Sequence, residues 1–363
     1  MTNELETKLA RIQDLLKAHN LDALLLQGVD NFAWATCGAA SYINTADNRG
    51  VGTLLITQEA RYLITNNVEA PRFRHEERLE PQGWEFVISP WYEPNEAIVK
   101  LTNGMRLGAD FAFPEATDLR AALTALRINL LPEEQARFKE VSRGCASAME
   151  QAIQRVEPGM TEFEIAAVLN EETQQIGILP IVNLIATDER IYNYRHPLPT
   201  DKKLERYAML VLCGRKNGLV CSLTRLVHFG ALSDDLRRKT EAVAVIDANF
   251  IAATQPGKKI TEIFQKVQSV YAEVGFADEW QLHHQGGPAA YNPREDIVTP
   301  ASDLTVEAGQ VYAWNPSITG TKSEDTILVL DDGFEIMSEI PGWPMLSTDV
   351  DGLEILRPAI LVK

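Results

Sequence analysis

Positive charge is scarce in this sequence. Lys and Arg together number 34 against 51 Asp and Glu, which gives a formal net charge of −17 at pH 7. An excess of negative charge of this size repels phosphate backbones and anionic lipid head groups. We therefore expect no nucleic-acid partner and no membrane partner.

Long apolar runs are also lacking. The longest uninterrupted hydrophobic segments have the length of a β-strand, which is too short to span a bilayer as a helix. The first residues, 1–6, have neither the basic start nor the apolar run of a signal peptide. These two observations predict a cytoplasmic protein.

Cysteine is rare, and its spacing excludes the common redox and zinc motifs. The four cysteines, Cys37, Cys145, Cys213 and Cys221, lie far apart with no CxxC pair. Three of them fall inside apolar segments that are typical of a core. We interpret all four as reduced, structural residues.

The chain is long enough for two domains. It has 363 residues, of which 45% are hydrophobic, so each of two domains can bury its own core. In residues 1–128 helical and strand-forming patterns alternate, with strands expected at 23–26, 52–57 and 61–65 and the last two joined as a hairpin. We predict an α/β N-terminal domain.

A second domain, 129–363, opens with two helices. Pro132, followed by acidic residues, marks the start of the first helix, and Thr161 with Glu164 forms a capping box for the next one. From residue 207 onward strand-forming segments dominate, interrupted by a helical stretch at about 235–253. Segregated helices and strands of this kind predict an α+β fold.

Five segments of the second domain resemble, in order and spacing, the catalytic domain shared by creatinase, prolidase, aminopeptidase P and methionine aminopeptidase. The segments are EPGMTE (157–162), GLVCSLTR (218–225), HHQGG (283–287), EAGQV (307–311) and SEDTILV (323–329). The resemblance implies the "pita-bread" fold of the creatinase and methionine aminopeptidase type for 129–363, with a creatinase-like α/β domain before it.

The metallopeptidases of this family hold two divalent ions with two aspartates, one histidine and two glutamates. By resemblance, these positions fall on Leu212, Ser222, His284, Asn315 and Glu324. Two dications need several hard oxygen ligands, and one imidazole with one carboxylate cannot neutralise them. We therefore expect neither a metal nor another cofactor.

Creatinase is the family's precedent for hydrolysis without a metal, and its catalytic histidine corresponds to His196 in the segment YRHPLPT (194–200). A neutral imidazole can take a proton from water and return it to a leaving nitrogen. The segment is a polar turn rather than part of an apolar core. This setting favours a catalytic His196 over a histidine that only holds a loop.

Three further residues are expected to take part in catalysis. His284 and Glu324 orient the substrate, and the hydroxyl of Tyr291 donates to an oxyanion. If the chain is extended at His283 and His284, their rings point to opposite sides, and the family pattern selects His284 for the pocket. A stabilising role for His284, an exposed strand-end role for Glu324 and a packing role for Tyr291 remain alternatives.

The expected substrate-binding residues are led by two arginines. Arg225 and Arg294 each offer two parallel donors to a carboxylate, although an internal ion pair is the alternative for both. Glu295, His283 and Thr224 complete this set. Creatinase has a glutamate where this chain has Thr224, and a guanidinium needs carboxylate partners, so creatine itself is not the expected substrate.

The favoured hypothesis is a metal-independent hydrolase of a C–N bond in a small amide, amidine or guanidino-type substrate. The alternatives are an Xaa-Pro aminopeptidase or dipeptidase with atypical metal ligands, and a pseudo-peptidase that only binds. Creatinase-like relatives close each site with the neighbouring subunit, which implies a homodimer. Arg49, Arg72 and Arg74 are candidates to reach across.

Overall fold

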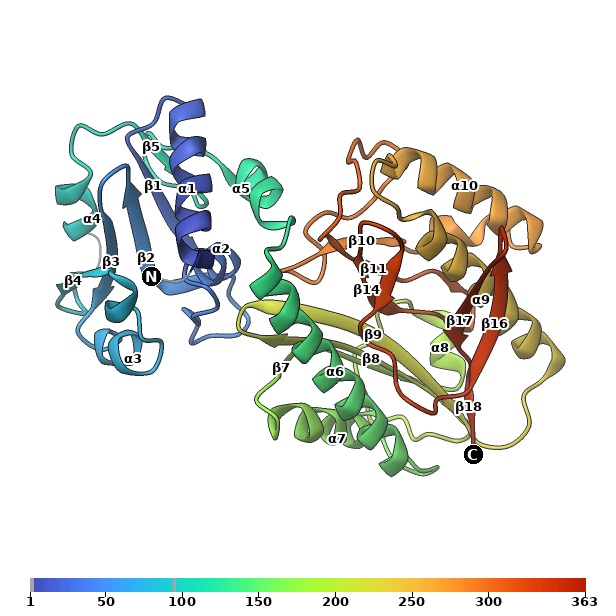
Figure 1. Ribbon diagram of the computed structural model, residues 1–363. Coiled ribbons are helices and arrows are strands. Elements are labelled where there is room, and N and C mark those ends of the chain that lie inside the picture. Colours follow the sequence, from blue (N-terminus) through green and yellow to red (C-terminus); the bar gives the residue numbers. More distant parts are fainter. Residues whose placement is uncertain (1–2, 94–95) are drawn as a thin grey trace. The chain divides into compact units, whose positions relative to one another are not determined.

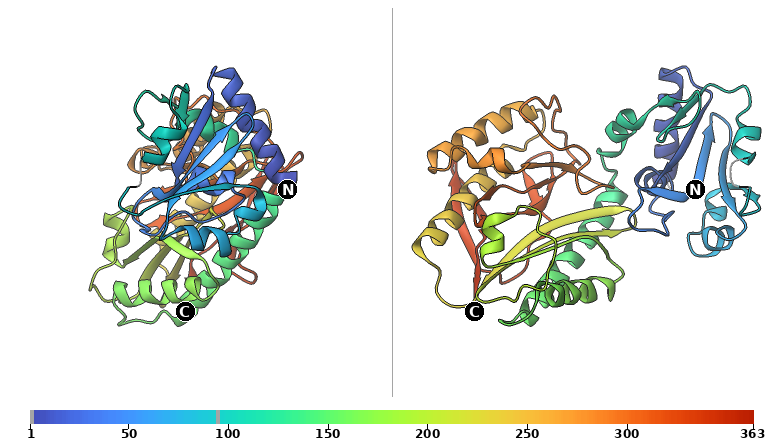
Figure 2. Two further views of the ribbon diagram at one scale, coloured as in Figure 1. Left: turned by 90° about the vertical axis from the view of Figure 1, so that its left-hand side faces the viewer. Right: turned by 180° about the vertical axis from the view of Figure 1, so that it is seen from behind.

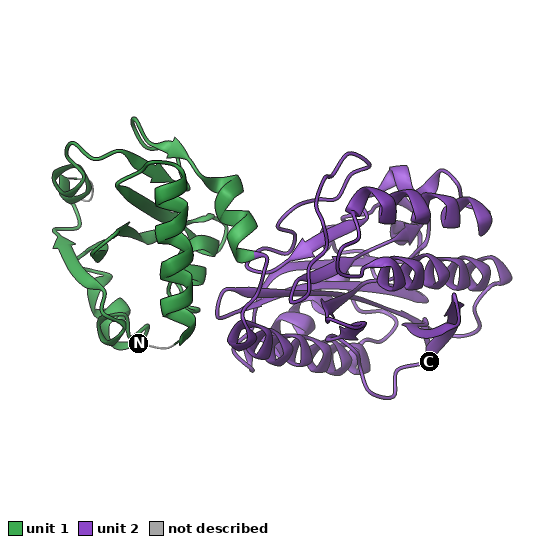
Figure 3. Cartoon of the chain, turned by 45° about the horizontal axis from the view of Figure 1, so that its top comes forward, with its two compact units in different colours: residues 1–127 green, residues 128–363 purple. Residues whose placement is uncertain are grey.

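The computed structural model describes residues 3–93 and 96–363, which form two compact units, Met1–Arg127 and Ile128–Lys363 (Figure 3). The expectation that there is no signal peptide concerned residues 1–6, of which residues 1–2 lie outside the described part. Across the described residues, none of the helices is both long enough and apolar enough to cross a membrane.

The first unit is built around one six-stranded sheet with the order β4-β3-β2-β1-β5-β6. In chain order its elements are α1 (Asn3–Ala18), β1 (Ala23–Gly28), α2 (Val29–Ala35), β2 (Arg49–Thr57), β3 (Arg61–Asn66), α3 (Ala70–His75), η1 (Glu80–Gln82), β4 (Glu85–Ser89), α4 (Glu96–Leu101), β5 (Leu107–Ala109), β6 (Thr117–Asp118) and α5 (Arg120–Arg127).

The central strands of this sheet follow from continuous apolar runs. Leu25 of β1 lies opposite Leu55 of β2, and Leu55 lies opposite Tyr62 of β3 in the antiparallel hairpin that the sequence predicts. Leu24, Leu25 and Leu26 have no exposed surface, as expected for a strand that is buried on both faces. The unit is α/β.

The second unit contains two four-stranded sheets, β18-β9-β8-β7 and β10-β11-β14-β15, and two short hairpins, β12-β13 and β16-β17. In chain order its elements are α6 (Pro132–Arg155), α7 (Glu162–Gln174), β7 (Leu179–Thr187), α8 (Glu189–Asn193), β8 (Tyr207–Lys216), β9 (Leu219–His228), α9 (Asp234–Ala253), α10 (Ile260–Glu273), η2 (Glu279–Leu282), β10 (Gly286–Ala289), β11 (Val311–Trp314), β12 (Ser317–Ile318), β13 (Thr321–Lys322), β14 (Asp325–Val329), β15 (Phe334–Ile336), β16 (Met345–Val350), β17 (Leu353–Pro358) and β18 (Leu361–Val362).

The helix starts of the second unit agree with the sequence signals. Pro132 opens α6, and at the start of α7 the side chains of Thr161 and Glu164 each accept a hydrogen bond from the other residue's backbone N–H. Strand β7, however, precedes residue 207, where strands were expected to begin. Its pattern was obscured because it is only partly buried and contains Pro180.

The helices enclose the two sheets. In Figures 1 and 2, α6 and α7 cover the outer face of β7, β8 and β9, whereas α9 and α10 lie on the opposite side of this unit. The sheets meet where Thr224 of β9 bridges Glu324 just before β14. On the α9 side, Phe250 stacks on Trp314 with ring centroids 4.4 Å apart.

A buried network of four charges ties these layers together. Arg225 pairs with Asp325 at 2.8 Å, Arg357 pairs with the same Asp325 at 2.8 Å, and Arg357 also pairs with Asp247 at 2.6 Å. All four side chains are almost completely buried. Two positive and two negative charges cancel, which is the arrangement that allows ions in a core.

Candidate active site

A cavity of about 310 Å³ in the second unit contains the main residues that the sequence singles out. It is lined by Val182, Leu184, His196, Val211, Cys213, His284, Pro293, Arg294, Asn315, Lys322 and Glu324. They lie on β7, β8 and β13, and in the segments that join α8 to β8, η2 to β10, β10 to β11, β11 to β12 and β13 to β14. We treat this cavity as the candidate active site.

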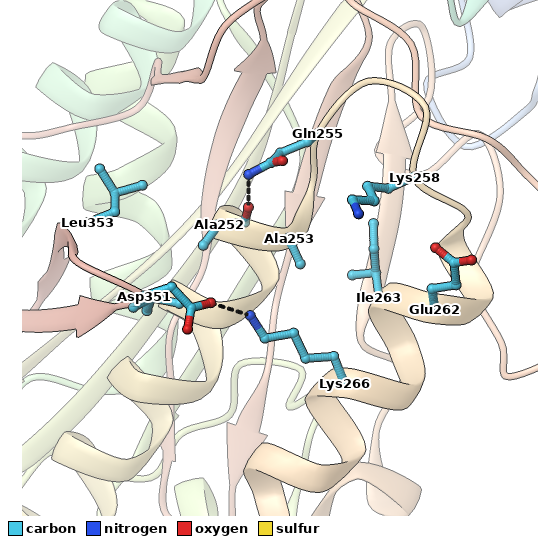
Figure 4. A pocket seen from close by; sticks show the side chains of 10 residues that line it. Ala252, Ala253, Gln255, Lys258, Glu262, Ile263, Lys266, Asp351 and Leu353 are labelled. Atoms are coloured by element: carbon cyan, nitrogen blue, oxygen red, sulfur yellow. Dashed lines mark hydrogen bonds and ion pairs between the residues drawn. The ribbon is translucent and has the colours of Figure 1, made fainter.

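A larger cavity, of about 380 Å³, lies between α9, α10 and the β16-β17 hairpin (Figure 4). It contains none of the candidate residues. Its Lys266 is held by Asp351 at 3.3 Å, as the dashed line in Figure 4 shows. An exposed lysine with its own counterion is an ordinary surface feature, so this cavity is not the site.

Glu324 is fully engaged by other side chains. Its Oε1 accepts from Arg294 at 2.7 Å, and its Oε2 accepts from Thr224 at 2.5 Å and from Lys322 at 2.7 Å. Burial alone would raise the pKa of Glu324, but Lys322 and Arg294 outweigh it and hold the pKa well below its usual range. Glu324 is therefore an anion that two side-chain cations already neutralise.

Lys322 is the important residue that sequence reasoning missed. It is 7% exposed, lines the cavity and pairs with Glu324. The signal was present, because residues two apart on an extended segment share a face and Glu324 was already placed in the pocket. With Arg294, Lys322 and Glu324 together, the cavity wall carries one net positive charge.

Three histidines converge at one end of the cavity. The Nε2 atoms of His196 and His283 lie 3.1 Å apart, and the ring of His284 is 5.5 Å from His196 and 4.5 Å from His283, centroid to centroid. Burial, then the nearby cations, lowers the pKa of His284 to about 4 and that of His283 further, and it also lowers the pKa of His196. All three are neutral near pH 7.

The expectation that His283 and His284 point to opposite sides is wrong. Both rings contact His196. The two residues lie in a bend between η2 and β10 rather than in a strand, so strict alternation does not apply. His283 contacts His196 and Ser317, and it does not line the main cavity. It therefore acts on the site through His196.

On β8 the residues that line the cavity are Val211 and Cys213, not Leu212. Cys213 lies directly opposite Ser222 of β9, whereas Leu212 pairs with Leu223 and points to the other face of the sheet. Leu212 therefore lies outside the cavity wall, although the family resemblance placed a ligand position there. Burial raises the pKa of Cys213 to about 11, so this thiol stays protonated.

These residues do not fit the two-metal site of a metallopeptidase. On β8 the cavity wall carries Val211 and Cys213, and Ser222 of β9 accepts from Arg294. The position of the first glutamate carries Asn315, and Glu324 already accepts from two cations. Divalent ions of this type need several free oxygen ligands, preferably carboxylates. No step of the chemistry is therefore assigned to a metal pair.

Two of the expected site residues lie elsewhere. Tyr291 is completely buried and donates its hydroxyl to Glu134 of α6 at 2.6 Å, so it cannot reach an oxyanion in the cavity. Arg225 is 1% exposed and belongs to the buried charge network, so it is not a substrate anchor. For Tyr291 the alternative of a packing role applies, and for Arg225 the alternative of an internal ion pair.

Two others act indirectly. Glu295 accepts hydrogen bonds from the backbone N–H groups of Tyr291 and Asn292 and so shapes the loop that carries Arg294. Thr224 donates to Glu324 and fixes that carboxylate. Neither residue lines the cavity.

Several buried polar atoms at the cavity have no protein partner among the described residues. They are Oδ1 of Asn315, Nδ1 of His284 and Nε of Arg294. Buried polar groups are normally hydrogen-bonded, and exceptions tend to mark places where something else binds. The cavity thus offers both acceptors and donors for a polar ligand.

The fold and the site define a two-domain pita-bread hydrolase, as the sequence resemblance implied. The model of metallopeptidase family M24 matches residues 136–331, more than half of the 363 residues. The chain therefore belongs to metallopeptidase family M24.

Relatives in sequence are distant. The chain is 23% identical over 243 residues to an uncharacterized peptidase of Staphylococcus haemolyticus, covering 64% of this chain and 68% of the relative. It is 23% identical over 235 residues to an uncharacterized peptidase of Staphylococcus aureus, covering 61% of this chain and 65% of that relative. The match thus leaves about a third of each relative uncovered.

Solved structures share the fold over almost the whole chain. The prolidase from Pyrococcus horikoshii superposes with a TM-score of 0.79 at 19% identity and covers 92% of this chain and 98% of its own. An Xaa-Pro dipeptidase from Bacillus anthracis gives a TM-score of 0.79 at 17% identity and covers 99% and 100%. At these identities the likeness establishes the fold.

Proposed function

We propose that this protein is a metal-independent hydrolase that cleaves a C–N bond in a small polar substrate such as an amide or amidine. The observation that carries the proposal is the state of Glu324, whose two carboxylate oxygens accept from Lys322 and Arg294. Side-chain cations thus stand beside the carboxylate that would otherwise hold a metal. Fixed positive charges of side chains therefore supply the electrostatic interaction with the substrate at this point of the cavity.

His196 is the proposed acid and base. It is exposed at the cavity and neutral near pH 7, because burial of part of its ring and the charge of Lys322 lower its pKa. When His196 donates through Nε2–H to His283, its Nδ1 has a free lone pair that can take a proton from water. The same nitrogen returns the proton to the leaving amine.

The rest of the cavity binds and orients the substrate. Val182, Leu184, Val211 and Pro293 form an apolar wall, while the polar groups gather around Glu324. Small-molecule sites commonly combine an apolar lining with a few fixed polar groups. His284 completes the polar side of the cavity.

The direct test is turnover by metal-free protein. Purified, chelator-treated protein is screened against small amides and amidines, and in parallel against Xaa-Pro dipeptides with and without Mn²⁺. Hydrolysis of a small amide that does not respond to metal supports the proposal. Dipeptide cleavage that requires metal contradicts it.

One observation favours a second candidate, a peptidase with a single metal ion. The three histidines each offer a nitrogen, and these atoms lie within 4.8 Å of one another. Three histidines suit Zn²⁺. The neighbouring charges of Lys322 and Arg294, which lower the pKa of His284, also repel a dication, and we therefore rank this candidate second.

The third possibility is a binding module without catalysis. It predicts ligand affinity without turnover, and the same screen separates it from an enzyme. The contact between His196, which lines the cavity, and His283 favours the hydrolase, because it orients the imidazole of His196.

A further inference from the structure

The excess positive charge of the cavity identifies the substrate class more closely. Resting on the site proposed above, we infer that Lys322 and Arg294 form an anion subsite and that the ligand is a small carboxylate that also carries a neutral amide. The anion subsite narrows the proposed set of small polar substrates to those that carry a negative charge.

The first step of the argument is a charge count at the cavity wall. Lys322 and Arg294 contribute two positive charges, and Glu324 contributes one negative charge. The three histidines are neutral near pH 7. One positive charge is left over in a poorly solvated place, and a monoanionic ligand would neutralise it.

The buried layer below the cavity does not supply the missing negative charge. Arg225, Arg357, Asp247 and Asp325 pair among themselves and sum to zero. They are therefore not available to balance Lys322. The counter-charge has to come from the cavity side, where the ligand binds.

Lys322 has free donors for such a ligand. An ammonium group offers three N–H donors, and Glu324 is its one partner within the described part of the chain. Its side chain lines the main cavity and also a small neighbouring cavity next to His283. An incoming carboxylate can thus accept from Lys322 without displacing Glu324.

A second feature specifies the neutral half of the ligand. Oδ1 of Asn315 is buried, has no hydrogen-bond partner in residues 3–93 and 96–363, and belongs to a residue that lines the cavity. A carbonyl oxygen of this kind accepts from an N–H group, such as that of an amide. A cavity of 310 Å³ lies at the lower end of the usual range of about 300–1,000 Å³, so the ligand is small.

The same charges exclude guanidino cations without a carboxylate. A guanidinium needs carboxylate partners, and the cavity's one carboxylate, Glu324, already accepts from two cations. Bringing a third cation next to Lys322 and Arg294 adds like-charge repulsion at low dielectric. We therefore expect discrimination by charge as well as by shape.

The test measures binding, not turnover. Ligand-observed NMR is run on wild-type protein with matched pairs, N-acetylglycine against N-acetylglycinamide and N-acetylalanine against its amide, with agmatine as the cation. We expect the two carboxylates to bind and their amides and agmatine to bind at least about tenfold more weakly, as a charged hydrogen bond implies.

Variants assign the effect to Lys322. Lys322→Met should weaken carboxylate binding about 10- to 100-fold, and Lys322→Arg should restore most of it. Lys258→Met, which removes an exposed lysine of the other cavity, is the matched control and should bind like wild type. Thermal melts of each variant show whether it is folded.

Glu324→Gln should change carboxylate affinity in the direction opposite to Lys322→Met. It removes the competing anion beside Lys322, so carboxylate affinity should rise, whereas a ligand that is held by Glu324 itself would lose affinity. The inference is overturned if no carboxylate of the panel binds, if carboxylate and amide bind equally, or if folded Lys322→Met binds as wild type does. Absence of turnover would contradict the proposed hydrolase but leave the charge-selective binding intact.

Discussion

Nε2 of His196 lies 3.1 Å from Nε2 of His283, and Nδ1 of His283 lies 3.5 Å from the buried hydroxyl of Ser317. A chain of polar contacts therefore leads from the core of the second unit to an exposed imidazole. A partner on one nitrogen fixes the tautomer and orientation of a histidine ring, which is what an acid–base residue requires.

Replacement of this exposed imidazole tests its catalytic role. We expect His196→Ala to lower kcat about 10²- to 10⁴-fold on any small amide that is turned over, with the melting temperature nearly unchanged because the side chain is exposed. Activity should decline on acidification with a pKa below 6.5, since only the neutral ring accepts a proton. Steady-state kinetics across pH, with circular dichroism melts, give both quantities.

The control for this variant is His19→Ala, an exposed histidine of the first unit that lies outside the cavity and should keep full activity. An unchanged rate for His196→Ala, or a variant that does not fold, would make His196 a structural residue.

Metal content is the second prediction. Protein purified without added metal should hold less than about 0.2 equivalents of Mn, Co or Zn, because the cavity lacks the free carboxylates that such ions need. Inductively coupled plasma mass spectrometry measures the content, and assays with and without EDTA measure dependence. One equivalent of zinc that is lost in His283→Ala would instead support the single-metal candidate.

The ion pairs of Glu324 should contribute strongly to stability. Glu324→Ala leaves Lys322 and Arg294 buried without their carboxylate, and we expect a loss of about 3–5 kcal/mol in the free energy of unfolding. Urea denaturation measures the loss. Glu335→Ala, which breaks the half-exposed pair with Lys139, is the control and should cost less than about 1 kcal/mol. Equal losses would show that the cavity charges are well hydrated.

Stability should depend on pH through the buried histidines. The folded-state pKa of His284 is lowered to about 4 from 6.5, and that of His283 is lowered further. As pH falls through 6.5 the unfolded chain therefore binds protons that the folded protein does not. With respect to these groups, stability is constant from about one pH unit above 6.5 upward and falls as pH falls below that.

Melting temperatures at pH 7.5, 6.5, 5.5 and 4.5 test this window. The decline between pH 7.5 and 5.5 is assigned to the histidines, because Glu324, whose ordinary pKa is 4.5, also contributes near pH 4.5. His284→Gln should flatten the decline, whereas His19→Gln should not. A wild-type melting temperature that stays constant from pH 7.5 to 4.5 would contradict the lowered pKa values.

The homodimer expected from the family resemblance gives the last prediction. Light scattering at micromolar concentration should report a dimer. A monomer would contradict the expectation that the neighbouring subunit closes each active site. Among the three arginines considered, Arg72 bonds to Glu77 and Arg74 to Glu80, whereas Arg49 is exposed. Arg49→Ala should then lower kcat/KM without changing the mass in solution, and Arg120→Ala is an exposed control.

The fold was predictable because its signals are local and repeated. Thr161 with Glu164 specifies a helix start, and the apolar run at Leu24 to Leu26 specifies a buried strand. Strand β7 was missed because Pro180 and partial burial weaken its pattern. Local pattern thus predicted the long buried strands, whereas the short strands β5 and β10 were not predicted although they are also buried.

The site was only partly predictable. Family resemblance located His196, His284, Arg294 and Glu324, which the fold brings together at one cavity. It misplaced Tyr291, because a linear motif does not tell which way a buried side chain points, and here the hydroxyl turns toward α6. Leu212 lies outside the cavity wall for a related reason, since neighbouring residues of a strand point to opposite faces.

The missed residue, Lys322, shows the limit of reasoning from a family's pattern. The search was for ligands that the metallopeptidases share, and a lysine is not one of them. Physical reasoning about the segment TKSE, in which Lys322 and Glu324 share a face, would have found it.

The self-neutral layer of Arg225, Arg357, Asp247 and Asp325 has an evolutionary consequence. It meets the segment of Glu324 through the backbone, since Arg225 donates to the carbonyl oxygen of Glu324 and not to its side chain. Exchange of cavity side chains therefore leaves the scaffold's own charges balanced. In evolution or by design, side chains of the cavity can change one at a time, for instance to aspartate at Cys213 or Ser222, while the charge balance of the buried network stays the same.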